Sequence, residues 1–150
     1  MTAGERLIDT NVLVHAYVHL DARKQTVAQA LVLAIWNDGG GLTTIQNLCE
    51  FFAVATSKIE RPMPVDQAGR IVKEILGSTK WRVLDRRPGT VVQAIELVTL
   101  HRASFWDALI AACMLEHGIG SIVTENERDF KKIPGMTVIN PFKAHLKRHD

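Results

Sequence analysis

The sequence predicts an α/β fold with a central parallel sheet of about five strands flanked by helices, a Rossmann-like arrangement. Short apolar segments alternate with longer segments whose apolar residues recur at helical spacing. Polar side chains follow several of the short segments, as they do at the carboxyl edge of a parallel sheet. With 150 residues, of which 47% are hydrophobic, the chain can build one core but not two. We therefore expect one domain that covers residues 1–150.

Periodicity and turn residues place the individual elements. The expected strands lie at 7–8, 42–43, 81–84, 121–124 and 136–139. The expected helices lie at 12–18, 21–37, 45–58, 65–76, 90–101 and 104–115, with a helical turn in 125–130 and a basic amphipathic tail at 142–150.

Composition limits the compartment and the partners. The 18 Lys and Arg residues exceed the 16 Asp and Glu residues by only two, which permits nucleic-acid binding without requiring it. Cys49 and Cys113 each lie in an apolar helical pattern, which predicts buried free thiols in a reducing compartment. No apolar stretch approaches the roughly 18 residues of a membrane span. We expect a cytoplasmic protein without membrane contact.

Asp9, followed by Thr10 and Asn11, ends the first apolar segment. Ligands of open α/β sheets bind outside the carboxyl ends of the strands, so a carboxylate at this position indicates a functional site. Asp9 or Thr10 could instead cap the helix that follows, which is the more common role of an isolated Asp at a strand-to-helix junction. The rest of the chain has to decide between the two interpretations.

Two further acids lie in apolar surroundings. Glu50 is in the middle of a helix that is apolar around most of its circumference, where an acid is either functional or confined to the surface. Asp107 lies three positions after Ser104, at the start of a segment with scarcely a polar residue. A capping-box variant and the helix dipole would explain the position of Asp107 but not its apolar neighbourhood.

A fourth acidic segment, 125–129, follows the strand expected at 121–124. The carboxyl ends of strands one and four can be neighbours in a doubly wound sheet, so these acids can converge on one crevice. Clustered carboxylates repel each other unless a cation lies between them, and the sequence has no His or Cys cluster that favours zinc. Oxygen ligands suit Mg²⁺ or Mn²⁺, which support hydrolysis of a phosphodiester.

The ordered set of motifs resembles PIN domains, and in particular the VapC toxins of bacterial type II toxin–antitoxin pairs. The matching stretches lie at 8–13, 47–51, 105–110, 123–126 with 129–130, and 139–142. The resemblance implies a PIN-like fold and an endoribonuclease, a hydrolase that depends on Mg²⁺ or Mn²⁺. It also implies a cognate VapB-like antitoxin and a homodimer.

Carried over by position, this resemblance assigns the site. Asp9, Glu50 and Asp107 match the three acids of the family's metal site. Asn126 stands where many relatives have Asp, so Asp129 is expected to be the fourth catalytic acid, bound to the metal directly or through water. The polar positions that orient these acids are matched by Thr10, Asn11, Ser104, Thr124 and Asn126.

Two alternative functions are considered. A haloacid-dehalogenase-like phosphatase would use Asp9 as its nucleophile, but it needs an Asp as general acid where this chain has Asn11. A PIN-like module that binds RNA or protein without catalysis is favoured by the missing fourth acid and opposed by the three acids that are present. Binding of Mg²⁺ distinguishes this module from the enzyme.

Two surface properties are also expected. Apolar excess on the helices at 45–55 and 65–76 favours a homodimer. Basic residues at the rim of the crevice should hold RNA phosphates, so that binding weakens with salt. These basic residues are Arg23, Lys24, Arg82, Arg86, Arg87, Arg102, Lys131, Lys132, Lys143, Lys147 and Arg148.

Overall fold

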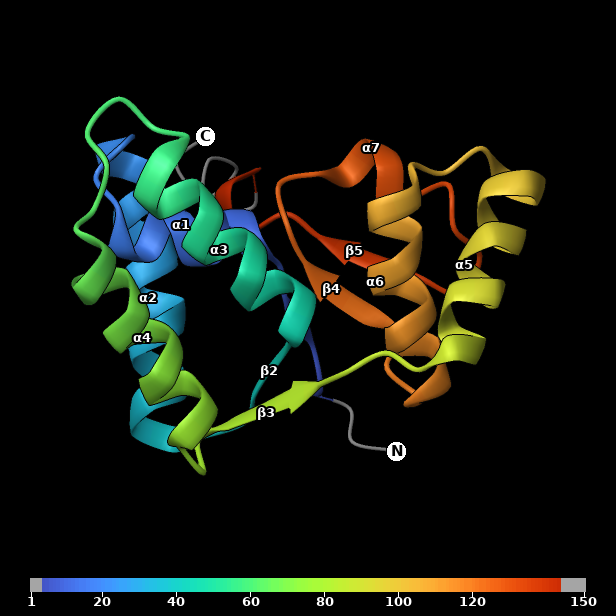
Figure 1. The fold of residues 1–150 in the computed structure, drawn as a ribbon, viewed down its shortest axis with the longest axis horizontal. Coiled ribbons are helices and arrows are strands. Elements are labelled where there is room, and N and C mark those ends of the chain that lie inside the picture. Colours follow the sequence, from blue (N-terminus) through green and yellow to red (C-terminus); the bar gives the residue numbers. More distant parts are fainter. Residues whose placement is uncertain (1–3, 144–150) are drawn as a thin grey trace.

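The computed structural model describes residues 4–143, in which strands and helices alternate along the chain (Figure 1). The strands are β1 (Leu7–Ile8), β2 (Gly41–Thr44), β3 (Trp81–Leu84), β4 (Ser121–Val123) and β5 (Thr137–Ile139). The helices are α1 (Thr10–Tyr17), α2 (Ala22–Asp38), α3 (Ile45–Ser57), α4 (Val65–Gly77), α5 (Pro88–His101), α6 (Phe105–Glu116) and α7 (Glu127–Phe130). Most of the predicted basic tail, from residue 144 onwards, lies outside the described residues.

All strand pairs are parallel, as predicted, but the five strands form two sheets. β1, β4 and β5 form one sheet in the order β1-β4-β5, and β2 pairs with β3 in the other. β2 lies beside β1, where the Thr43 hydroxyl donates to the Ile8 carbonyl oxygen at 3.0 Å. A side-chain bond thus links the two sheets where a single five-stranded sheet would have a backbone ladder.

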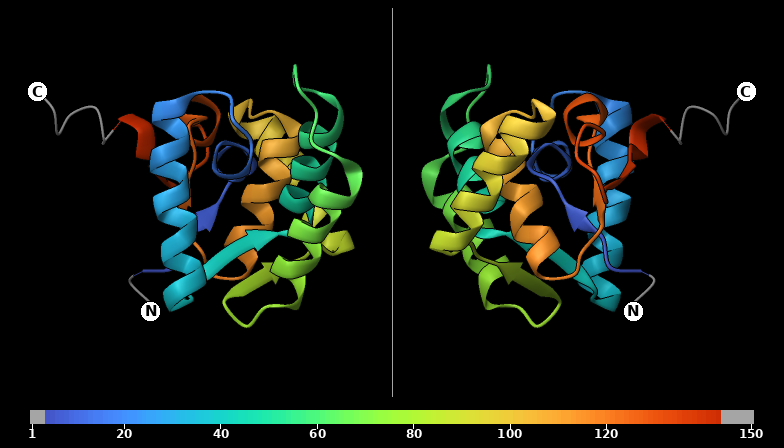
Figure 2. Two further views of the ribbon diagram at one scale, coloured as in Figure 1. Left: turned by 90° about the vertical axis from the view of Figure 1, so that its left-hand side faces the viewer. Right: turned by 90° about the vertical axis from the view of Figure 1, so that its right-hand side faces the viewer.

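Helices cover both sides of these strands. In Figure 2, α2 lies on one side of the strands and α4 on the other. α1 packs against α2 and α3, α3 against α4, and α5 against α6. The predicted parallel α/β architecture is therefore confirmed, with all crossover helices in place.

Two apolar clusters hold the ends of the site-bearing elements. One surrounds α6, whose residues Ala108–Met114 are all buried, and includes Leu7 of β1 and Ile122 of β4. The other joins Leu13 of α1 to Phe51 of α3. The polar residues that follow β1, precede α6 and lie on α3 are thus attached to rigidly packed supports.

The two cysteines have free thiols, as predicted, but differ in burial. Cys113 is buried, whereas Cys49 is exposed on α3, so the prediction that both are buried is wrong for Cys49. At about 100° per residue, Cys49 projects on the side of α3 opposite the buried Phe51. Among the helices of residues 4–143, none is both long and apolar enough to cross a membrane.

Candidate active site

Asp9 is the centre of the site. Its backbone N–H donates to the Val123 carbonyl oxygen at 3.0 Å, which continues the β1–β4 pairing past Ile8. Its side chain caps α1 by accepting from the Thr10 backbone N–H at 2.8 Å. The carboxylate is 5% exposed, so its helix-capping role does not account for the cost of its burial.

Hydrogen-bond donors surround the buried Asp9 carboxylate. Oδ1 accepts from Thr10 N and from Asn47 Nδ2 at 2.9 Å, and Oδ2 accepts from Thr124 Oγ1 at 2.7 Å and Asn11 Nδ2 at 3.2 Å. Burial raises the pKa of Asp9, the hydrogen bonds from Thr124, Thr10 and Asn47 oppose this rise, and the charge of Asp107 adds to it. Asp9 is thus fixed in orientation by residues far apart in the sequence.

Asn47 on α3 is a site residue to which sequence reasoning assigned no role. It is fully buried, and its Nδ2 donates to Asp9 Oδ1 and to Thr10 Oγ1 at 3.0 Å. Its Oδ1 accepts from the hydroxyl of Thr44, which also caps α3 by accepting from the Asn47 backbone N–H at 3.0 Å. One signal was available, since Asn47 lies one helical turn before Glu50 on an otherwise apolar helix.

Asp107 opens α6 without forming the predicted capping box. The Ser104 hydroxyl donates to Asp107 Oδ2 at 2.8 Å and makes no cap bond to the helix backbone. Asn126 Nδ2 donates to the same oxygen at 3.1 Å. Burial raises the pKa of Asp107, these two hydrogen bonds lower it, and the negative charge of Asp129 raises it. Ser104 therefore orients the acid, because its hydroxyl is used by the carboxylate and not by the helix.

Glu50 is linked to the Trp106 backbone, next to Asp107, through a glutamine. Gln46 Nε2 donates to Glu50 Oε1 at 3.2 Å and to the Trp106 carbonyl oxygen at 3.0 Å, which connects α3 to the start of α6. Burial raises the pKa of Glu50, the bond from Gln46 lowers it, and the charges of Asp9 and Asp107 raise it. The predicted surface alternative for Glu50 does not fit this half-buried position between two other acids.

One cavity of about 330 Å³ joins these acids. Its lining includes Asp9, Glu50 and Asp107, together with Asn126, Glu125 and His15, and within residues 4–143 no Lys or Arg side chain lines it. Three carboxylates whose pKa values are raised, partly by one another, leave negative charge that protein cations do not neutralise. This oxygen-only donor set fits a hard divalent cation such as Mg²⁺ or Mn²⁺.

Glu125 differs from these three acids because it is neutralised. It accepts from His15 Nε2 at 3.1 Å and from Lys24 Nζ at 2.8 Å. Burial alone would raise the pKa of Glu125, but the bonds from Lys24 and His15 bring it below its ordinary value. Sequence reasoning assigned no partner to Glu125, because His15 and Lys24 lie more than 100 residues earlier.

The segment after β4 organises the rest of the site. Thr124 is fully buried, and its hydroxyl accepts from Asn11 Nδ2 at 3.0 Å and from the Asn126 backbone N–H at 2.9 Å. Asn126 lines the cavity, whereas Asp129 on α7 does not, although its charge acts on Asp107. Asp129 Oδ1 lies 3.6 Å from Lys132 Nζ. The structure thus brings Asp9, Glu50, Asp107 and Asn126 to one cavity and places Asp129 next to Asp107 but outside the lining.

A second group of potential ligands is more tightly clustered. Within residues 4–143, one set of three His, Cys, Asp or Glu side chains has its ligand atoms within 4.8 Å of one another, and it consists of Cys113, Glu116 and His117. The carboxylates of the acidic cavity are therefore farther apart than this. Mg²⁺ keeps several waters in proteins, so direct contact with every acid is not required.

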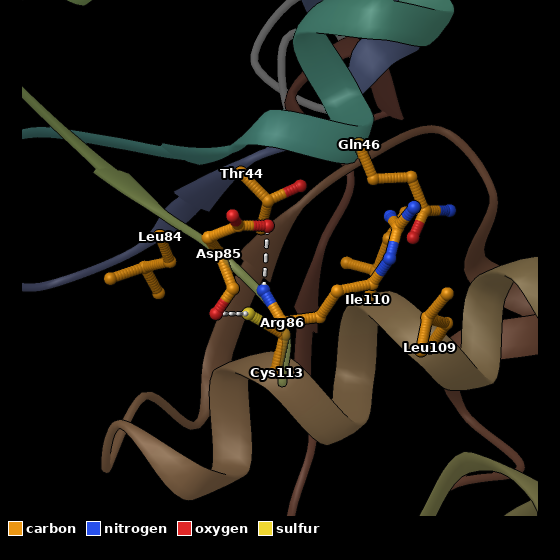
Figure 3. Close-up of a pocket in the computed structure, with 8 residues that line it drawn as sticks. All are labelled: Thr44, Gln46, Leu84, Asp85, Arg86, Leu109, Ile110 and Cys113. Atoms are coloured by element: carbon orange, nitrogen blue, oxygen red, sulfur yellow. Dashed lines mark hydrogen bonds between the residues drawn. The ribbon is translucent and has the colours of Figure 1, made fainter. Parts of the chain in front are cut away.

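The hydrogen bonds of this second cluster identify it as structural. Figure 3 shows the Cys113 thiol directed at the Asp85 carbonyl oxygen, to which it donates at 3.4 Å. Burial raises the pKa of Cys113 to about 11, which disfavours the thiolate that binds metals. Glu116 is bonded to the Thr90 hydroxyl, and His117 Nδ1 lies 2.7 Å from the Cys113 carbonyl oxygen. The Thr90 bond joins α6 to the start of α5, and the Cys113 bond joins α6 to the residue that follows β3.

The basic residues predicted to form a rim are mostly engaged elsewhere. Lys24 reaches the cavity through Glu125. Five others form ion pairs with acids: Arg82 with Glu5, Arg87 with Glu116, Lys131 and Lys143 with Glu127, and Lys132 with Asp129. Lys147 and Arg148 lie outside the described residues. Positive charge at the rim is therefore confined to fewer residues than predicted.

Fold and cavity together define an α/β protein with an acidic, oxygen-rich site at the carboxyl edge of its parallel strands. A family model described as PIN domain matches residues 6–136. The chain therefore belongs to the PIN domain family, as the motifs predicted. Membership of this family argues against the haloacid-dehalogenase-like phosphatase. Asn11, at the position where that phosphatase needs a general acid, donates a hydrogen bond to Asp9 instead.

Solved structures share this fold. A toxin–antitoxin complex from Klebsiella pneumoniae is 18% identical with a TM-score of 0.64, covering 91% of this chain and 97% of that one. DNA-bound VapBC from Salmonella typhimurium is 18% identical with a TM-score of 0.64, covering 91% and 98%. Mycobacterium tuberculosis VapC20, described as a sarcin–ricin loop cleaving toxin, is 24% identical with a TM-score of 0.60, covering 77% and 85%. No curated protein has a significantly similar sequence.

Proposed function

We propose that this protein is a Mg²⁺- or Mn²⁺-dependent endoribonuclease and the toxin of a VapBC-type pair. The observation that carries the proposal is the cavity in which Asp9, Glu50 and Asp107 meet with raised pKa values, while its one basic lining residue among the described residues, His15, is bonded to Glu125. Asp9 and Asp107 would hold the ion, and Glu50 and Asp129 are further ligands, directly or through water. A bound divalent ion lowers the pKa of water and stabilises the charge that develops on a phosphodiester.

The protein residues have separate roles in this reaction. Asn47, Thr124 and Thr10 keep Asp9 in one orientation, and Ser104 and Asn126 do the same for Asp107. A carboxyl group with a raised pKa accepts a proton more readily near neutral pH. We assign Glu50 this role of accepting the proton of the attacking water because, of the three cavity acids with raised pKa values, it accepts the fewest hydrogen bonds.

The structural relatives support the choice of substrate and partner. VapC20 is described as cleaving the sarcin–ricin loop, and the Klebsiella and Salmonella structures contain toxin–antitoxin complexes. By this similarity we assign RNA as the substrate and a VapB-like antitoxin as the partner. A homodimer is consistent with exposed Val65 and Leu76 on α4. The large apolar residues of α3, by contrast, are at least partly buried. Of the two helices predicted to form the dimer surface, α4 therefore offers more exposed apolar area than α3.

The test is metal-dependent RNA cleavage by wild type and Asp9→Asn. An Asn at position 9 keeps the shape of the side chain and can keep the oxygen that accepts from Thr10 N and Asn47 Nδ2, so the fold should persist, as circular dichroism would check. Asp9→Asn should lose at least about a hundredfold in rate, while Asp38→Asn, the same change at the exposed end of α2, should not. If Asp9→Asn cleaves at the wild-type rate with Mn²⁺, the proposal is wrong.

The alternative function is a PIN-like module that binds RNA or protein without catalysis, which Asn126 in place of an acid would favour. Calorimetric titration with Mg²⁺ or Mn²⁺ tests it independently of RNA. The wild type should give a saturable heat of metal binding, and Asp107→Asn should give none. No metal binding and no cleavage would leave the module that only binds RNA or protein as the better description.

A further inference from the structure

Trp106 is an exposed indole beside the acidic cavity. Trp106 directly precedes Asp107 and is 60% exposed. The Phe105 ring packs edge-on against one side of the indole, at 5.2 Å between ring centroids. Large aromatic side chains are mostly covered in folded proteins, so an exposed one next to a candidate active site indicates a contact surface. The Trp106 carbonyl oxygen accepts from Gln46, the residue that also orients Glu50, so the indole is attached to the same framework as the acids.

Trp106 lines a second cavity of about 400 Å³. Its walls include Glu50, Cys49, Ala53, Lys58 and Arg86. Glu50 lines both this cavity and the acidic one, so the two cavities adjoin at this carboxylate. A ligand that reaches the acids can therefore extend over the indole.

The second cavity has the positive charge that the acidic cavity lacks. Lys58 and Arg86 both line it, and within residues 4–143 neither the Lys58 ammonium nor the Arg86 guanidinium lies within 4.0 Å of a carboxylate oxygen. Arg86 is exposed, and its side chain extends beside Gln46 (Figure 3). An aromatic face flanked by two free cations is complementary to a base joined to phosphates.

We propose that Trp106 is a stacking platform for an unpaired base of the RNA next to the cleaved phosphodiester, with Arg86 and Lys58 holding its phosphates. The proposal rests on the proposed function and names its substrate class, single-stranded RNA. Bases that are unpaired can stack on an aromatic ring, whereas bases within a duplex cannot reach it. Because every base has a π face, this contact selects unpaired RNA without selecting one base.

Tryptophan fluorescence and cleavage kinetics test this assignment. A short unstructured oligoribonucleotide, added in EDTA to prevent cleavage, should quench the emission of wild type, whereas its duplex should not. Trp36 and Trp81 pack against each other at 6.2 Å, so Trp106→Phe should abolish most of the quenching. In Mg²⁺ or Mn²⁺, Trp106→Leu should raise KM roughly 10- to 100-fold, the range of one base stack, with kcat within about twofold. Trp106→Phe should restore most of the affinity, and Leu100→Ala, which shortens another exposed apolar side chain, should change neither constant.

The outcomes separate the inference from the proposed function. If wild type cleaves RNA but Trp106→Leu has an unchanged KM, the stacking role is wrong and the nuclease stands. Absence of cleavage by wild type counts against the nuclease itself, and absence of quenching by RNA overturns the platform even then. An indole whose emission responds to a purified antitoxin and not to RNA would also overturn it, because the surface would then serve a protein partner.

Discussion

Asn47→Ala should weaken both the fold and the site. The substitution removes a buried bond to the Asp9 carboxyl group, worth about 1.5–3 kcal/mol when that group is charged, and the bond from the Thr44 hydroxyl, worth about 1 kcal/mol. With the small cavity that remains, we expect the free energy of unfolding to fall by about 3–5 kcal/mol. At a urea m value of about 2 kcal/mol/M, the unfolding midpoint should fall by about 2 M.

The same substitution should alter the pH dependence of cleavage. The Asn47 bond lowers the pKa of Asp9, so its loss raises that pKa further, and the acidic limb of the rate profile should move to higher pH. Asn37→Ala removes the same atoms from an exposed position on α2 and is the control. If Asn47→Ala and Asn37→Ala have equal urea midpoints and superimposable pH profiles, the role assigned to Asn47 is wrong.

Three other predictions follow from the charges of the site. Mg²⁺ or Mn²⁺ should raise the melting temperature more at pH 8 than at pH 5, because protons compete for carboxylates with raised pKa values. Without metal, these acids make the fold less stable as pH rises through their folded pKa values, so equal metal effects at both pH values in scanning fluorimetry would contradict the site. RNA affinity should fall steeply with salt, and a binding curve that is flat between 50 and 200 mM, about the range over which phosphate contacts are lost, would reject a cationic rim. Asp129→Asn should raise the Mg²⁺ concentration for half-maximal rate at pH 8, because we expect Asp129 to be a ligand. If Asp129 acts only on the pKa of Asp107, through its charge and its hydrogen bond, the acidic limb should move to lower pH without that rise.

The sequence predicted the elements because their signals are local. Apolar periodicity and the turn residues between segments identified every strand and helix to within a few residues. The adjacency of β1 and β4 followed from the general geometry of parallel sheets, and the observed pairing of Ile8 with Val123 agrees with it. The division into two sheets could not be predicted, because it depends on whether two short backbones approach closely enough to form a ladder.

The individual bonds of the site were less predictable. Ser104 and Asp107 have the spacing of a capping box, but the same spacing also allows the hydroxyl to donate directly to the carboxylate, as it does. Asn47 carries no local signal for its partner, because Asp9 lies 38 residues earlier in the chain. Long-range pairs of this kind depend on the packing of α3 against α1, which the periodicity of neither helix specifies.

Asn11 shows why a carboxamide serves this site where a second carboxylate would not. Its amide nitrogen donates to both Asp9 Oδ2 and Thr124 Oγ1, and its oxygen accepts from the Glu125 backbone N–H at 3.2 Å. A carboxylate is acceptor-only when ionised, so it would lose both donated bonds and repel Asp9. The bond to Asp9 is the longest of the four that this carboxylate accepts, so Asn11 can release that oxygen and still donate to Thr124. Asn11 therefore holds the end of β4 against the start of α1 while leaving Asp9 able to take a new ligand.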